Sequence, residues 1–120
     1  MLIAQLSDPH IRAEGELYQG VVDSNRMFAE ALAHLHALDH LPDLLVLTGD
    51  LVDEGQTEEY EMVRQLLSAS RIPFLVIPGN HDHRESFRAA FSDHPYLPKA
   101  GSLHWCVDDH AVRIIGLDSC

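Results

Sequence analysis

The sequence is short of cysteine, of basic residues and of long hydrophobic runs, and each shortage argues against a class of protein. Its two cysteines, Cys106 and Cys120, form neither a CxxC pair nor a dense disulfide framework, which favours the reducing cytoplasm. Lysine and arginine number 8 against 19 aspartates and glutamates, and the net charge of −11 argues against a nucleic-acid polymer or an anionic membrane as partner. The apolar runs are strand-sized, far below the roughly 20 residues that a membrane helix needs, and no secretory signal is visible. We therefore expect a soluble, cytoplasmic protein.

What the chain does contain is a regular alternation of strand-like and helix-like segments. Its 120 residues, 46% of them hydrophobic, suit one α/β domain with a modest core. Helical spacing of apolar residues predicts one helix capped by Asp23 or Ser24, a second helix capped by Thr57 and a third helix from Arg84 to Phe91. Strands are expected at 2–6, 44–47 and 74–77, and an antiparallel hairpin is expected to join 103–107 to 112–117. The intervals between the first three strands are long enough for crossover helices, so the pattern predicts two β-α-β units.

Three short polar clusters stand where the three predicted strands end: Asp8-Pro9-His10, Gly49-Asp50 and Gly79-Asn80-His81-Asp82. Right-handed crossovers bring the carboxyl ends of successive parallel strands to one edge of the sheet, where open α/β folds place their sites. Each cluster alone is typical of a turn or a helix cap. Together they carry complementary oxygen and nitrogen donors, which independent turns have no reason to do, so a metal-centred active site is the leading hypothesis.

Four residues of these clusters are candidate metal ligands, namely Asp8, His10, Asp50 and Asn80. Asp8 and His10 alternate along a segment that we expect to be extended, so both would face the same ion. Asp50 would bridge that ion to a second one, and the Asn80 carbonyl oxygen would be a weaker ligand. Oxygen and nitrogen ligation without thiolate favours two divalent ions of Mn, Fe, Co or Zn. A pair of ions roughly 3.5–4 Å apart is the usual device for in-line attack on phosphorus.

Two further residues are candidate catalytic groups. His81 directly follows Asn80 and would face the substrate, either to stabilise developing charge or to protonate the leaving alkoxide. Asp53 lies shortly after Asp50 and would hydrogen-bond to His81 and orient it.

These motifs resemble the first three blocks of the calcineurin-like metallophosphoesterases: Asp8-x-His10, Gly49-Asp50-x-x-Asp53-x-Gly55 and Gly79-Asn80-His81-Asp82. Within that family, the segments 7–10, 18–23, 107–109 and 117–119 resemble bacterial class III cyclic-nucleotide phosphodiesterases and the related glycerophosphodiesterase. The resemblance implies that Asp8, His10 and bridging Asp50 serve one metal, and that Asp50 and Asn80 serve the other. His81 would then face the substrate, with Asp53 as its partner. The implied reaction is hydrolysis of a phosphodiester by a metal-bridging hydroxide.

The resemblance also implies an αββα fold, a β-sandwich of two mixed sheets flanked by helices, with about twice this length of chain. Residues 1–120 would be the N-terminal part of a single domain, its β-α-β-α-β portion plus a hairpin. The later histidine and the Gly-His-x-His block that complete the family's site would lie downstream. Other histidines are potential substitutes, with His83 the best placed among His34, His36, His40, His83, His94, His104 and His110. An uncovered sheet face would favour a homo-oligomer.

Several alternatives stay open on the sequence. The preference for a diester over a monoester rests on the subfamily resemblance, and cyclic nucleotides and glycerophosphodiesters are both compatible with it. The rival from another class is a non-catalytic, truncated α/β module that folds or oligomerises without turning anything over.

Overall fold

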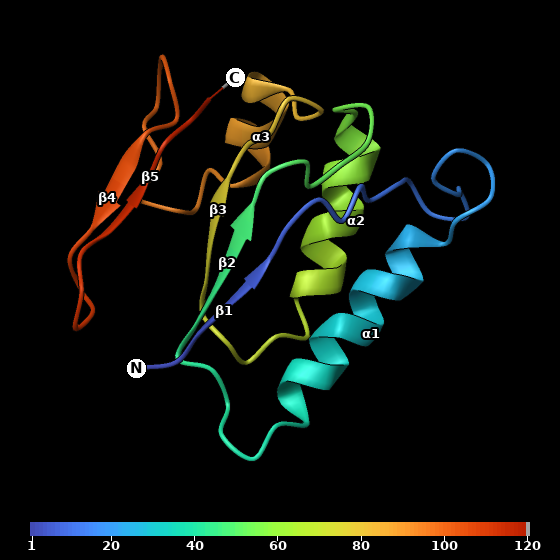
Figure 1. Ribbon diagram of the computed structural model, residues 1–120. Helices are drawn as coiled ribbons and strands as arrows, with labels where there is room; N and C mark the ends of the chain where they lie inside the picture. The colour runs from blue at the N-terminus through green and yellow to red at the C-terminus, as the bar shows by residue number, and fades with distance from the viewer. Residues whose placement is uncertain (120) are drawn as a thin grey trace.

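A parallel sheet of three strands forms the middle layer of the computed structural model, which describes residues 1–119. The strands are, in sheet order, β1 (Ile3–Leu6), β2 (Leu44–Thr48) and β3 (Phe74–Ile77). Helices α1 (Ser24–His36) and α2 (Thr57–Leu67) lie on one side of the sheet (Figure 1). The antiparallel hairpin of β4 (Trp105–Val107) and β5 (Ile114–Gly116) lies on the other side. The short helix α3 (Arg84–Ala90) packs against α2. The predicted β-α-β-α-β portion followed by a hairpin is therefore confirmed.

Both long helices begin at a capping residue at or next to the predicted position. The Asp23 carboxylate accepts a hydrogen bond from the backbone N–H of Arg26 (3.1 Å), so Asp23 is the cap of α1. In α2 the cap is Gln56 rather than the predicted Thr57. The reason is a capping box, in which the Glu59 carboxylate accepts from the backbone N–H of Gln56 (3.0 Å).

The core lies between the sheet and its helices. The strand run 44–47 is almost wholly buried, as expected for a parallel strand that is covered on both faces. Its side chains belong to one cluster of buried apolar groups with residues of α1, α2, β3 and α3, among them Phe28, Tyr60, Val63, Val76 and Phe87. This packing holds the carboxyl ends of the three strands in fixed register, with Leu45 paired to Phe74 and Leu6 to Leu47.

The hairpin is fastened to the sheet by the indole ring of Trp105. Its Nε1–H donates to the carbonyl oxygen of Val76 in β3 (2.9 Å). Gly116 lies opposite Trp105 in the hairpin, and a Cβ atom there would lie 2.4 Å from the ring, so only glycine fits. Beyond β5, the buried Asp118 carboxylate accepts from Arg84 Nε (2.8 Å) and joins the hairpin to α3.

Some apolar side chains stay exposed around these layers. Ile3 of β1 is 42% exposed and Ile115 of β5 is 61% exposed. The predicted self-association is thus compatible with this surface and stays a prediction. Within residues 1–119, no helix combines the length and the apolar character that crossing a lipid bilayer requires.

Candidate metal centre at the carboxyl ends of the strands

The structure brings Asp8, His10 and Asp50 together where β1 and β2 end. The Nε2 atom of His10 lies 3.9 Å from Oδ1 of Asp8 and 3.8 Å from Oδ2 of Asp50. Both separations are too long for hydrogen bonds. Two donors bound to one ion at about 2.0–2.2 Å lie roughly 3–3.6 Å apart, so small side-chain movements would let all three donors reach one ion. Two carboxylates and an imidazole without thiolate fit a divalent ion such as Mn, Fe, Co or Zn.

The backbone at these candidate ligands is in the left-handed region rather than extended. Asp8, His10 and Asp50 have positive φ angles of 55°, 45° and 48°, so the prediction of an extended segment through Asp8 and His10 is wrong. The cause is continued pairing beyond the strands, since the N–H groups of Asp8 and His10 donate to the carbonyls of Gly49 (3.0 Å) and Asp50 (3.1 Å). A left-handed non-glycine residue costs roughly 1–2 kcal/mol, and such residues cluster at functional sites.

Close backbone contact fixes the Asp50 carboxylate against Gly79. A Cβ atom at Gly79 would lie 2.2 Å from Oδ1 of Asp50, which excludes any side chain there. The same Oδ1 accepts from the backbone N–H of His81 (2.9 Å), so Oδ2 is left facing His10. Asn80 is exposed in the same turn after β3, and within residues 1–119 no hydrogen bond holds its side chain. Its role as a ligand stays a prediction.

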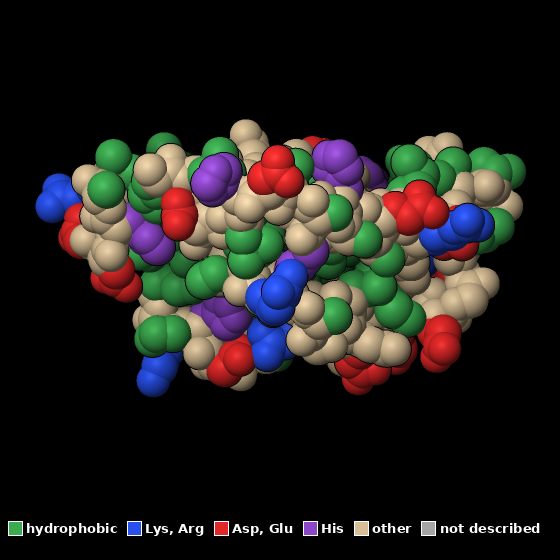
Figure 2. All heavy atoms as spheres, turned by 90° about the horizontal axis from the view of Figure 1, so that it is seen from below, with side chains coloured by type: hydrophobic (Ala, Val, Ile, Leu, Met, Phe, Trp, Pro, Cys, Tyr) green, Lys and Arg blue, Asp and Glu red, His purple; other side chains and the backbone are tan. Residues whose placement is uncertain are grey.

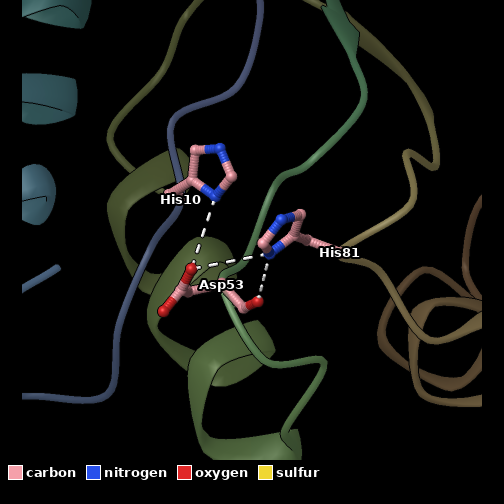
Figure 3. A group of neighbouring side chains, drawn as sticks. All are labelled: His10, Asp53 and His81. Carbon is pink, nitrogen blue, oxygen red and sulfur yellow. Dashed lines mark hydrogen bonds and ion pairs between the residues drawn. The ribbon is translucent and has the colours of Figure 1, made fainter. Parts of the chain in front are cut away.

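Asp53 lies between His10 and His81 (Figure 3). Its Oδ1 is 3.5 Å from Nδ1 of His10 and 3.6 Å from Nδ1 of His81. The shortest contact is made by the Asp53 backbone, because Nδ1–H of His81 donates to that carbonyl oxygen (2.7 Å). A nitrogen that carries this proton has no lone pair for a metal, so the Nδ1 of His81 does not complete a second ligand set with Asp53 and His10.

The environment of His81 favours its protonated form. The hydrogen bond to the Asp53 carbonyl, helped by the carboxylates of Asp50, Asp53 and Asp82, raises the pKa of His81 above its ordinary value. The side chain is 40% exposed and its ring lies edge-on to that of His10, with centroids 4.8 Å apart. His81 therefore presents a proton-bearing group to solvent beside the candidate ligands.

Asp82 joins the loops that follow β2 and β3. Its Oδ2 accepts from the N–H groups of Gly79 (2.8 Å) and Leu51 (3.2 Å), and its Oδ1 accepts from the Tyr60 hydroxyl (2.8 Å). Burial raises the pKa of the Asp82 carboxyl, and these donors oppose that shift. Since donors of the protein occupy its oxygens, Asp82 is a structural member of the third cluster rather than a ligand.

Sequence reasoning misses the contacts of Arg12 and Tyr18 with this centre. The Arg12 guanidinium donates to Oδ2 of Asp53 (2.9 Å). The Tyr18 ring stacks on His10 with centroids 4.9 Å apart and lines a cavity of about 290 Å³ next to Asp8. The available signal for Arg12 was a lone arginine shortly after the Asp-x-His motif in an acidic chain. The signal for Tyr18 was its place at the start of the segment 18–23, which carries part of the subfamily resemblance.

Three of the alternative histidines are committed to structural hydrogen bonds. His83 caps α3, with its Nδ1 accepting from the N–H of Ser86 (3.3 Å). The Nε2 of His36 accepts from the N–H of Arg71 (3.0 Å), and the Nδ1 of His104 accepts a backbone N–H near the end of the hairpin (2.9 Å). These contacts occupy lone pairs that a metal would need, so none of the three substitutes for a missing ligand in this arrangement.

Comparison with known proteins finds relatives that align along nearly the whole chain. The chain is 36% identical over 119 residues to a probable glycerophosphodiester phosphodiesterase GpdQ of Arcobacter nitrofigilis, and 38% identical over 123 residues to the GpdQ of Enterobacter lignolyticus. It is 36% identical over 126 residues to a probable cyclic nucleotide phosphodiesterase of Rhodococcus erythropolis. These alignments cover 98–99% of this chain but only 39–44% of each relative, so the chain spans less than half their length. The family model of calcineurin-like phosphoesterases matches residues 1–116, and the chain therefore belongs to that family.

Proposed function

We propose that the protein is a metal-dependent phosphodiesterase with a binuclear centre. The observation that carries the proposal is the arrangement of His10, Asp8 and Asp50. Their donor atoms face one another without hydrogen bonds between them, and all three residues have positive φ angles. The three donor atoms lie within 4.8 Å of one another, and two carboxylates at such a distance repel unless a cation lies between them. The family and the names of the relatives support a phosphoesterase.

In this proposal, Asp8, His10 and Asp50 hold one divalent ion, and Asp50 and Asn80 hold the other. Such a pair of ions, when bound, supplies water activation and neutralises charge on the phosphoryl oxygens. The metals that suit the donors are Mn, Fe, Zn and Co. Gly79 lets Asp50 approach the turn that carries Asn80, which supports a bridging position for Asp50.

His81 is the proposed catalytic acid. Its Nδ1 is fixed by the Asp53 carbonyl, so its Nε2 is the atom that would meet the substrate. The raised pKa of His81 favours the form that carries a proton, which the residue would give to the leaving alkoxide or a phosphoryl oxygen. Asp53 orients His81 through its backbone and faces it with its carboxylate.

The proposed substrate is a small phosphodiester, either a glycerophosphodiester or a cyclic nucleotide. Both groups occur among the named relatives, at 36–38% identity. We propose a cytoplasmic enzyme and no role for a nucleic-acid polymer or a membrane, in keeping with the net charge of −11.

The test uses the complete natural protein, stripped of metal by a chelator and reloaded with Mn²⁺. We expect hydrolysis of bis(p-nitrophenyl) phosphate only after reloading, at a rate well above that of p-nitrophenyl phosphate. The reverse preference would establish a monoesterase, and activity that survives chelation would contradict the metal centre. His81→Gln should lower kcat by about 100-fold or more while leaving Mn²⁺ affinity nearly unchanged, whereas the neighbouring His83→Gln should keep kcat.

A further inference from the structure

The side chain of Asn25 holds the backbone of Arg12 in place. Its N–H donates to Oδ1 of Asn25 (2.8 Å), and its carbonyl oxygen accepts from Nδ2 of the same side chain (2.9 Å). Asn25 stands in the first turn of α1, so the helix fixes the chain just after the candidate ligand His10. The Arg12 side chain is only 14% exposed and extends across the loop that follows β2.

The Arg12 guanidinium lies among four carboxylates. Its Nη1 is 2.9 Å from Asp53, 3.1 Å from Glu54 and 3.4 Å from Glu59, and its Nη2 is 2.6 Å from Glu16. Glu59 is fully buried, and its other oxygen accepts from the N–H groups of Glu54 (2.9 Å) and Gln56 (3.0 Å). Because these hydrogen bonds fix Glu59, its Oε2 is a fixed negative charge 3.4 Å from Nη1 of Arg12.

Arg12 sets the orientation of the Asp53 carboxylate. Oδ2 is taken by Arg12, which turns Oδ1 toward the Nδ1 atoms of His10 and His81 (Figure 3). The buried Nδ1 of His10 has no hydrogen bond at this distance, so a carboxylate is the group that faces it. A carboxylate beside Nδ1 favours the tautomer with the proton there and leaves the lone pair of Nε2 free for a metal.

We propose that Arg12 is a positioning residue for the metal centre. By holding Asp53 between its guanidinium and the two imidazoles, it selects the tautomer of His10 that carries its proton on Nδ1. The lone pair of Nε2 then faces Asp8 and Asp50. The inference rests on the proposed function only in so far as the selected lone pair is meant for a metal. The contacts described above are specific to Arg12. Arg26, by comparison, pairs with Glu30 at 3.0 Å on the surface of α1, where both side chains are largely exposed.

The experiment compares Arg12→Met with the matched surface variant Arg26→Met in the complete natural protein. The first readout is the ¹⁵N chemical shifts of the His10 and His81 rings in metal-free protein, at a pH where both rings are neutral. The second is Mn²⁺ affinity by calorimetry. For R12M we expect the His10 nitrogen shifts to move toward a tautomer mixture and Mn²⁺ affinity to fall by about 10- to 100-fold. R26M should match the wild type in both.

Either of two results would overturn the proposal. One is wild-type ring shifts and Mn²⁺ affinity in a folded R12M protein, even a less stable one, since Arg12 would then only support the fold. The other is an equal change in R26M, which would indicate a general effect of charge. If R12M does not fold, Arg12→Lys against Arg26→Lys decides, because lysine keeps the charge but cannot reproduce the planar fork. A wild-type protein that binds no Mn²⁺ would contradict the proposed function, while the ring shifts would still judge Arg12.

Discussion

Aspartate and histidine occur at both ends of the parallel sheet, and the two ends use them differently. Where the strands begin, Oδ2 of Asp43 accepts from the N–H of Leu2 (2.7 Å). There, Nδ1–H of His36 donates to a backbone carbonyl (2.7 Å), and its Nε2 accepts from the N–H of Arg71 (3.0 Å). Figure 2, which views the molecule from below, shows acidic, basic and histidine side chains scattered among apolar ones on that face.

Where the strands end, the same residue types leave donor atoms facing one another. Asp8, His10 and Asp50 approach to 3.8–3.9 Å without a hydrogen bond between them, on backbone in the left-handed region. Residue type alone therefore does not distinguish a cap from a ligand. The distinction lies in whether donor atoms are left that no backbone group occupies, as Oδ2 of Asp50 is, and whether the local chain is strained to bring them together.

The contrast between the two ends of the sheet fails if substitutions of Asp50 and Asp43 have the same effect on metal binding. Asp50→Asn should weaken Mn²⁺ binding by more than about 100-fold, since residues that merely support ligands are worth about 10- to 100-fold. Asp43→Asn should leave Mn²⁺ affinity unchanged and lower the free energy of unfolding by roughly 1 kcal/mol. Calorimetric titration and urea unfolding measure the two effects, and equal Mn²⁺ affinities in the two variants would remove the distinction.

A second test concerns the glycine against which Asp50 packs. Gly79→Ala puts a Cβ atom 2.2 Å from Oδ1 of Asp50, so we expect a loss of about 1–3 kcal/mol in stability together with weaker Mn²⁺ binding. The control is Gly15→Ala, where φ is +80° but no atom lies within 4 Å of the new Cβ. That variant should cost roughly 1–2 kcal/mol and leave Mn²⁺ affinity intact. Unchanged metal binding in G79A would show that Asp50 does not need its present position.

Substitution of a histidine at one end of the sheet should affect stability, and substitution at the other end should affect metal binding. His36→Leu removes two hydrogen bonds and should lower stability by roughly 1–2 kcal/mol without affecting Mn²⁺ binding. His10→Leu should abolish Mn²⁺ binding while changing the stability of the metal-free protein less. Thermal unfolding with and without Mn²⁺ reports both quantities. A metal-dependent rise in Tm that survives in H10L would count against His10 as a ligand.

The smallest expected effect concerns His94, a histidine among aromatic rings with no proposed role at the centre. Burial, helped by Arg64 and opposed by Asp93, lowers the pKa of His94. The Arg64 guanidinium donates to its Nε2 (3.3 Å), which requires a neutral ring. The unfolded chain takes up this proton near its ordinary pKa of about 6.5, before the native state does, so stability is retained above that pH and lost below it.

Urea unfolding at about pH 5.5 and about pH 7.5 measures this dependence. His94→Gln should flatten the fall in stability toward acid pH, and the exposed His40→Gln is the matched control that should not. An unchanged slope in H94Q would assign the acid sensitivity to other groups.

Much of this arrangement is predictable from the sequence, because β-α-β connectivity alone brings three strand ends to one edge. The polar clusters at Asp8, Asp50 and Asn80 mark those ends, and the apolar runs mark the strands. The left-handed backbone at Asp8 is not predictable, since aspartate itself does not require it and pairing to the Gly49 carbonyl imposes it. The surroundings of Arg12 are also hidden, because its partners lie far apart in the chain and meet only after folding.

The carboxylate of Asp82 has a consequence for how the centre opens. It holds backbone N–H groups of Leu51 and Gly79, which belong to the loops after different strands, together with the Tyr60 hydroxyl. Neither loop can leave the sheet edge without breaking this shared hub, so the two form one cooperative unit. Their amide protons should exchange with solvent at a common rate, and release of an ion by local unfolding would be a single event rather than two independent ones.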